Sequence, residues 1–209
     1  MQKLKRMREF IINNYKWIVL SLCLTFLLFL IEDVVDNDII LFDETIYNVV
    51  ANHLIKDSFT PFFKLMTNFA NMYWLIGLAI ILLLSIKNRS IGKRIILNLG
   101  TSALTNYIIK LLLQRPRPIG NRIIEESGYS FPSGHSMVSM AFYGYLIYLI
   151  ITNVKNTYIK ILLTIILSIL ILCVGISRVY LGVHYASDVL AGFLVGIIYL
   201  IVFVHVTKT

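Results

Sequence analysis

Charged residues are scarce in this 209-residue chain: they make up 14% of the sequence, against 58% for hydrophobic residues. The mean hydropathy is +0.80, which excludes a soluble globular domain. Charge-free runs recur, and a membrane-crossing helix needs about 20 apolar residues. We therefore expect one compact membrane domain over residues 1–209.

Cysteine is nearly absent, and both copies, Cys23 and Cys173, lie in apolar runs. We predict buried free thiols rather than a disulfide. The first apolar run also lacks the small-residue cleavage site of a signal peptide, since it ends in "LIEDVVDND". We expect it to be retained as a first helix.

Acidic residues are outnumbered, 11 against 19 basic residues, which gives a net charge of +8. A nucleic-acid partner is disfavoured, because the basic residues are divided among short connections rather than gathered in one patch. The same distribution is typical of the positive-inside rule for membrane proteins. We therefore expect the lipid bilayer to be the partner of this chain.

The apolar runs predict an all-α, polytopic membrane protein with six transmembrane helices, at residues 17–31, 65–86, 95–114, 136–154, 161–175 and 189–207. Helices are required because lipid offers no hydrogen bonds to the backbone. The N-terminal segment, the connection "KNRSIGKR", Lys155, Lys160 and Lys208 fall on one side of this path. We assign that side, with both termini, to the cytoplasm of the cell.

The first connection on the outer side, "DETIYNVVANHL", predicts a short amphipathic helix at the membrane interface. Asp43 is a candidate N-cap, and Ile46, Val49, Val50 and Leu54 follow at helical spacing. A plain linker is the alternative interpretation.

Positive charges on the outer side oppose the orientation rule and so indicate a site that needs cations. Lys110 lies near a predicted helix end, and Arg115, Arg117 and Arg122 follow it. Snorkelling of the side chains to the membrane surface is one alternative. Neutralisation by nearby acids is another, with Glu125 and Glu126 as partners.

Two further segments supply the other polar groups of the outer side. In "PSGH", Pro132 and Ser133 are typical of a helix start, which offers free amides to an anion. Gly134 lets a ligand approach the backbone, and His135 follows.

In "SRVYLGVHYASDV", His184 and Asp188 are four residues apart and share one face of a helical turn. Asp188 can then hold one ring nitrogen and leave the other free as a nucleophile or base. A His–Asp pair that only stabilises a loop is the alternative.

Lys110, Arg117 and Arg178 are three cations without a dedicated acid in the sequence. Such a cluster predicts a dianionic ligand, with phosphate as the natural choice. Catalysis of phosphoryl transfer is mostly positioning and charge stabilisation. We expect no metal and no cofactor, because no carboxylate cluster suits two metals.

The three segments together resemble the signature of the phosphatidic acid phosphatase type 2 superfamily, in its small bacterial integral-membrane lipid phosphatase branch. The three parts are Lys-x6-Arg-Pro at 110–118, Pro-Ser-Gly-His at 132–135, and Ser-Arg-x5-His-x3-Asp at 177–188.

The resemblance implies a lipid phosphatase that forms a phosphohistidine at His184, with Asp188 orienting the ring and His135 protonating the leaving oxygen. It implies that the phosphate is bound by Lys110, Arg117, Ser133, Gly134 and Arg178. Arg115 and Arg122 lie outside the signature and are candidate headgroup contacts.

The implied substrates are undecaprenyl diphosphate, phosphatidylglycerophosphate and phosphatidate. The outward orientation slightly favours the prenyl diphosphate. The oligomeric state is not predicted. A non-enzymatic transporter or inactive relative, and a lipid phosphotransferase using the same phosphohistidine, stay open as alternatives. The soluble vanadate haloperoxidases share a similar signature, and the six predicted spans argue against them.

Overall fold

The computed structural model describes residues 2–36, 41–119 and 122–207, with side chains from residue 14 on. Within these residues the chain forms eight α-helices and no strand. The bounds are α1 Gln2–Val35, α2 Leu41–His53, α3 Thr60–Asn68, α4 Met72–Ser85, α5 Arg89–Leu113, α6 Gly134–Asn153, α7 Thr157–Tyr180 and α8 Ala186–Thr207.

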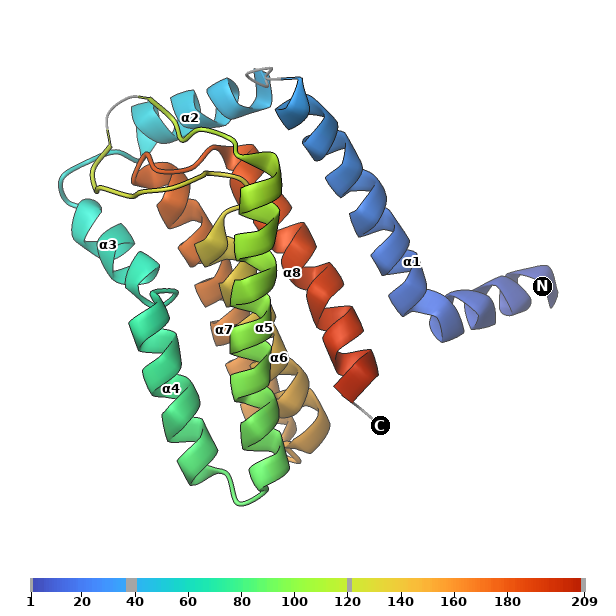
Figure 1. Cartoon of the computed structure of the whole chain (residues 1–209). Helices are drawn as coiled ribbons and strands as arrows, with labels where there is room; N and C mark the ends of the chain where they lie inside the picture. Colours follow the sequence, from blue (N-terminus) through green and yellow to red (C-terminus); the bar gives the residue numbers. More distant parts are fainter. Residues whose placement is uncertain (1, 37–40, 120–121, 208–209) are drawn as a thin grey trace.

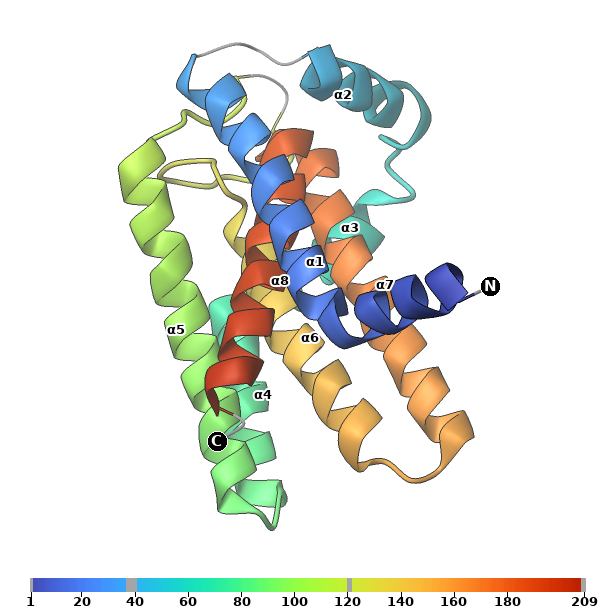
Figure 2. The same ribbon diagram turned by 90° about the vertical axis from the view of Figure 1, so that its right-hand side faces the viewer.

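The long helices form an elongated bundle, and α2 lies across one end of it (Figure 1). Helix α6 is central, since it packs against α5, α7 and α8, and half of its residues are buried. Helix α1 is peripheral: it contacts α8, and its first turns bend away from the bundle (Figure 2). The all-α membrane fold predicted from the sequence is confirmed.

Five helices are individually long and apolar enough to cross a membrane, and α3 with α4 forms a sixth, bent pair. The sequence predicted one continuous span over residues 65–86, whereas the structure breaks it at an angle of 51°. Asn71 explains the break, because its side chain caps α4 by accepting from the Tyr73 amide at 3.0 Å. The Tyr143 hydroxyl stabilises the break by donating to the Phe69 carbonyl at 2.6 Å.

The other helix ends differ from the prediction in a way that matters for the site. Helix α7 continues five residues beyond 175 and so carries Arg178, and α8 begins before 189 and so carries Asp188. The predicted interfacial helix is present as α2. Asp43 does not cap it but lies inside its first turn, buried against the bundle.

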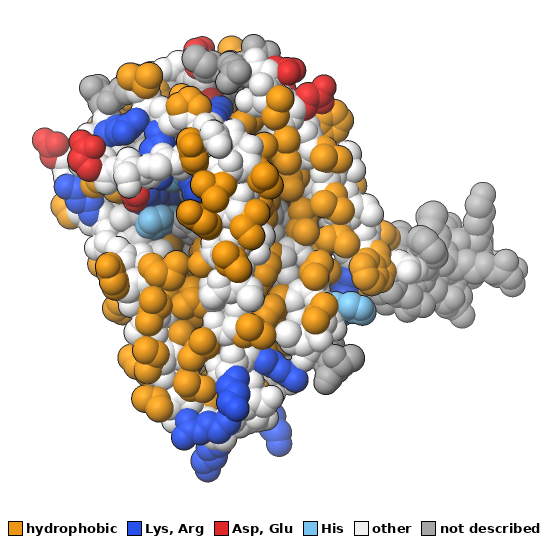
Figure 3. All heavy atoms as spheres, viewed as in Figure 1, with side chains coloured by type: hydrophobic (Ala, Val, Ile, Leu, Met, Phe, Trp, Pro, Cys, Tyr) orange, Lys and Arg blue, Asp and Glu red, His pale blue; other side chains and the backbone are white. Residues whose placement is uncertain are grey.

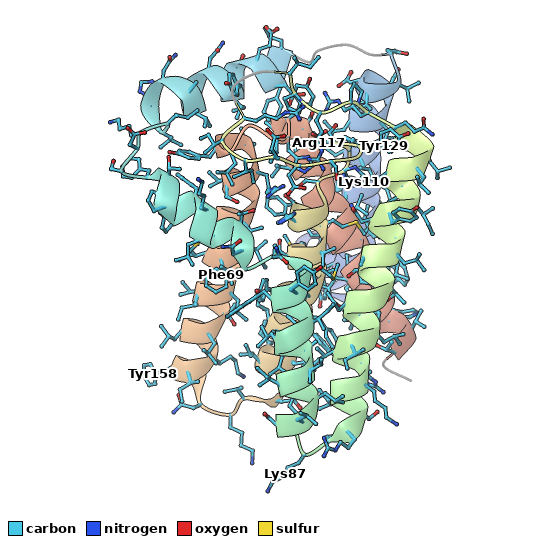
Figure 4. All side chains as sticks on the ribbon, turned by 60° about the vertical axis from the view of Figure 1, so that its left-hand side comes forward. Phe69, Lys87, Lys110, Arg117, Tyr129 and Tyr158 are labelled. Atoms are coloured by element: carbon cyan, nitrogen blue, oxygen red, sulfur yellow. The ribbon has the colours of Figure 1, made fainter. Side chains whose placement is uncertain are left out.

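The flanks of the molecule are covered by hydrophobic side chains, and charges gather at its two ends (Figure 3). In this view the acidic residues lie at the end that carries α2, together with some lysines and arginines, and the charged residues of the opposite end are lysines and arginines. Lys87, in the connection between α4 and α5, lies at that opposite end (Figure 4). This polarity fits a bilayer around the apolar flanks.

Candidate active site

The three signature segments meet beneath α2, at the end of the bundle opposite Lys87. Figure 4 shows Lys110, near the end of α5, together there with Arg117 and Tyr129 of the long connection between α5 and α6. This connection has little helical structure, and the prolines after Arg115 and Arg117 explain why α5 does not continue into it.

His184 lies at the centre of this region, and contacts at both of its ring nitrogens orient the ring. Its Nδ1 is 3.3 Å from Asp188 Oδ2, and its Nε2 is 3.1 Å from Arg117 Nη1. The other carboxylate oxygen of Asp188, Oδ1, accepts from Arg115. The Tyr185 amide donates to Asp188 Oδ2 at 2.9 Å. Nε2 therefore faces the cationic side of the site.

The surroundings of His184 favour a neutral ring. Burial lowers the pKa of His184 well below its usual value, and the positive charges of Arg178, Arg117 and Lys110 lower this pKa further. A neutral imidazole keeps a lone pair on one nitrogen, which nucleophilic attack requires.

The start of α6 forms the opposite side of the site. Ser133 is the N-cap, as predicted, and its amide donates to the Asp188 carbonyl at 2.9 Å, which ties α6 to α8. His135 follows in the first turn, within electrostatic reach of Arg178, Arg117, Lys110 and His184. Gly134 allows α5 to come close, since a Cβ there would lie 2.9 Å from Asn106 Oδ1.

The three predicted phosphate-binding cations are gathered, and backbone carbonyls hold two of them. Lys110 Nζ donates to the carbonyls of Tyr129 and Ser130. The Arg117 guanidinium donates to the carbonyls of Ser127, Gly128 and Val183. These contacts fix the two cations, and Glu126 Oε2 lies 3.9 Å from Arg117 Nη2.

Arg178 has an acidic partner in the structure, whereas the sequence offered no dedicated acid for it. Its Nη2 donates to Glu126 Oε1 at 2.5 Å, and its Nη1 donates to Thr67 Oγ1 at 2.6 Å. Its Nε has no hydrogen-bond partner among the described residues, although the side chain is 1% exposed. An anion that accepts from Nε would complete this guanidinium.

The two arginines outside the signature have different surroundings from those expected of headgroup contacts. Arg115 is 8% exposed and bridges Asp43, at 3.0 Å, and Asp188, at 2.7 Å. Its guanidinium is directed at two buried carboxylates of the protein itself. Arg122 is half-buried and donates to the Pro118 carbonyl.

Sequence reasoning missed Asp43 and Thr67 as members of this region. Asp43 lies on α2 and Thr67 on α3, and each is more than 70 residues from the groups that it contacts. A cavity of about 240 Å³ separates α2 from the segment that carries His184, and Tyr47, Pro118 and Tyr185 also line it.

Comparison with known proteins gives a family. A profile of the PAP2 superfamily matches residues 92–209, more than half of the chain. Phosphatidylglycerophosphatase B of Bacillus subtilis (strain 168) is 39% identical over 108 residues, which are 51% of this chain and 53% of that protein. The chain thus matches about half the length of that relative. An undecaprenyl-diphosphatase of Sulfolobus acidocaldarius is 27% identical over 192 residues, 87% of this chain and 86% of that protein.

Solved structures agree with the fold. The crystal structure of a transmembrane PAP2 type phosphatidylglycerolphosphate phosphatase from Bacillus subtilis superposes with a TM-score of 0.81 at 28% identity, over 90% of this chain and 96% of that one. Aquifex aeolicus LpxE, with a TM-score of 0.64 at 23% identity, shares the fold. With its apolar helices and its family profile, this multi-pass membrane protein belongs to the PAP2 superfamily.

Proposed function

We propose that this chain is a membrane lipid phosphatase that works through a phosphohistidine and needs no metal ion. We further propose that its residues 1–209 act as one phosphatase domain. The observation that carries the proposal is the placement of His184, with Nδ1 on Asp188 and Nε2 beside Arg117. Because a guanidinium can only donate, Nε2 is the unprotonated ring nitrogen, and it lies beside a cation proposed to bind the phosphate.

In the first proposed step, His184 Nε2 forms a bond to phosphorus while the bond from phosphorus to the lipid oxygen breaks. His135 gives its proton to the leaving oxygen. Asp188 stays ionised and stabilises the positive charge that the imidazole ring acquires. Three positive charges, on Lys110, Arg117 and Arg178, offset the charge on the phosphoryl oxygens.

In the second step, water attacks phosphorus while His135 accepts a proton from it. The bond between phosphorus and Nε2 breaks, and inorganic phosphate leaves. Ser133 and the Gly134 amide, at the start of α6, supply further hydrogen bonds to the phosphoryl oxygens.

Lipid phosphates and diphosphates are the proposed substrates, in the classes of undecaprenyl diphosphate, phosphatidylglycerophosphate and phosphatidate. The names of the relatives include both phosphatidylglycerophosphatase and undecaprenyl-diphosphatase, and a dolichyldiphosphatase of Saccharomyces cerevisiae is 36% identical over 99 residues. The site at one end of the apolar bundle suits a substrate whose tails remain in the bilayer.

The proposed orientation places the active site on the extracytoplasmic face of the cell membrane and both termini in the cytoplasm. It follows from the basic end that carries Lys87, opposite the site. Labelling of single cysteines by a membrane-impermeant maleimide would test it, with Lys87→Cys and Glu125→Cys in a chain that lacks Cys23 and Cys173. Labelling of Lys87→Cys in intact cells would contradict the orientation.

Phosphate release from the three lipids, in detergent with excess chelator, would test the activity. Wild type should release phosphate, and His184→Ala should release none. His53→Ala is the matched control, since His53 is exposed at the end of α2. No release by wild type, or equal release by His184→Ala, would overturn the mechanism. Transfer to an added alcohol in place of water would favour the phosphotransferase.

A further inference from the structure

A continuous series of buried charges leads from α2 to the proposed nucleophile. Asp43 on α2 accepts from Arg115 Nη2 at 3.0 Å, and Arg115 Nη1 donates to Asp188 Oδ1 at 2.7 Å. Asp188 Oδ2 then faces His184 Nδ1. Asp43, Arg115 and Asp188 are each 8% exposed or less.

Ser187 connects the same groups a second time. Its amide donates to Asp43 Oδ1 and its hydroxyl contacts Asp43 Oδ2, both at 2.7 Å. Arg115 Nη1 also donates to the Ser187 hydroxyl, at 2.8 Å. Asp43 thus caps the start of α8 from another helix, and this fixes the turn that carries Asp188.

Arg115 is positioned too firmly to serve as a mobile surface charge. Its guanidinium stacks on the Tyr185 ring, 4.2 Å from the centroid, and bridges two carboxylates. Burial lowers the pKa of Arg115, but Asp188 and Asp43 more than offset this and raise the pKa overall. The guanidinium therefore stays charged beside Asp188.

We propose that Arg115 and Asp43 are positioning residues of the active site that act on His184 through Asp188, so that α2 forms part of the catalytic centre. With Oδ1 held by Arg115, Asp188 keeps Oδ2 directed at the ring. Arg115 also tempers the negative charge of Asp188, which sets how readily His184 is protonated. This inference rests on the proposed phosphatase activity.

The charge environment of His184 gives the proposal a readout that a purely structural role would not change. Charged and titratable groups surround His184 from every neighbouring element. They are Lys110, Arg115, Arg117, Glu126, His135, Arg178, Tyr185 and Asp188. Asp43 acts on this set through its contact with Arg115. Loss of the Arg115 charge leaves Asp188 uncompensated and favours protonated His184. Loss of the Asp43 charge acts in the opposite direction.

The test compares kcat against pH for wild type, Arg115→Gln and Asp43→Asn on a short-chain lipid phosphate in detergent. We expect kcat to fall at least tenfold in both variants, with KM within about threefold. The acidic limb of the kcat profile should move to higher pH in Arg115→Gln and should not move to higher pH in Asp43→Asn. The ionisation of the substrate is common to all variants.

Matched controls separate this effect from general damage. Glu44 is the exposed neighbour of the buried Asp43, and Arg89 is an exposed arginine at the opposite end of the bundle. The controls are Glu44→Gln and Arg89→Gln. Both should keep the kcat and the profile of wild type. Arg115→Lys keeps the charge but cannot bridge two carboxylates, so it should lose kcat without moving the limb.

Full kcat in Arg115→Gln, or a loss of kcat with an unmoved acidic limb, would overturn the positioning role while the phosphatase proposal stands. If Arg115→Gln does not fold, Asp43→Asn and Arg115→Lys decide, and wild-type kcat in both overturns the proposal. Inactive wild type would instead remove the proposed function itself.

Discussion

The substitution Gly192→Ala tests whether the contact between α6 and α8 sets the geometry of the site. A Cβ on Gly192 would lie 2.8 Å from the Ser133 carbonyl oxygen and 2.9 Å from Ser136 Cβ. Backbone cannot swing aside as the end of a side chain can. The two helices must therefore separate where Ser133 donates to the Asp188 carbonyl.

The size of the effect follows from these distances. Ordinary contact begins at about 3.4 Å, so the 2.8 Å approach must lengthen by about 0.6 Å. A misplacement of about 1 Å costs roughly 100-fold in rate, and overpacking costs about 1–3 kcal/mol of stability. We expect kcat to fall by roughly 10- to 100-fold, because Ser133 and His135 move away from His184.

Initial rates of phosphate release at saturating lipid phosphate, with thermal unfolding in the same detergent, would measure the effect. Gly100→Ala is the matched control: Gly100 is also helical, and a Cβ there would meet nothing within 4 Å. Gly100→Ala should keep its rate and unfold at the same or a higher temperature. A Gly192→Ala rate within twofold of that control would refute the reasoning.

A change of pH and two substitutions give three further predictions. Because burial and the neighbouring cations lower the pKa of His184 below 6.5, this proposed nucleophile should stay neutral under mild acid. A steep loss of kcat already at pH 6.5 in a pH profile would contradict this. Thr67→Val removes the acceptor for Arg178 Nη1 and should weaken inhibition by inorganic phosphate roughly tenfold, since a buried donor left unpaired costs about 1–3 kcal/mol; an unchanged inhibition constant would argue against it. Tyr143→Phe removes the hydrogen bond to the Phe69 carbonyl and should cost about 1 kcal/mol of stability, measured by thermal unfolding, with kcat retained.

The membrane fold could be predicted from the sequence because lipid imposes simple rules on hydrophobic runs. Five of the six predicted spans correspond to one long helix each. The break in the sixth depends on Asn71 acting as a cap between two apolar helices. A polar residue in an apolar run gives a weak signal, since capping requires a particular backbone geometry.

Within the site, the local pairs were predictable and the distant ones were not. His184 and Asp188 meet because they are four residues apart, and Ser133 begins α6 as its sequence context indicates. Arg178 was expected to have no dedicated acid, and the structure pairs it with Glu126, 52 residues away. The two carboxylate partners of Arg115 were not predicted, because they lie more than 70 residues away and no local pattern predicts such a contact.

The position of Asp43 shows that the site extends beyond the segment that matches the family profile. That match begins at residue 92 and contains all three signature motifs. Yet Asp43 and Thr67 lie before it, and they accept hydrogen bonds from Arg115 at 3.0 Å and from Arg178 at 2.6 Å. A buried cation with only part of its hydrogen bonds satisfied is costly. Arg115 and Arg178 therefore need contacts from α2 and α3 to be stable at their buried positions.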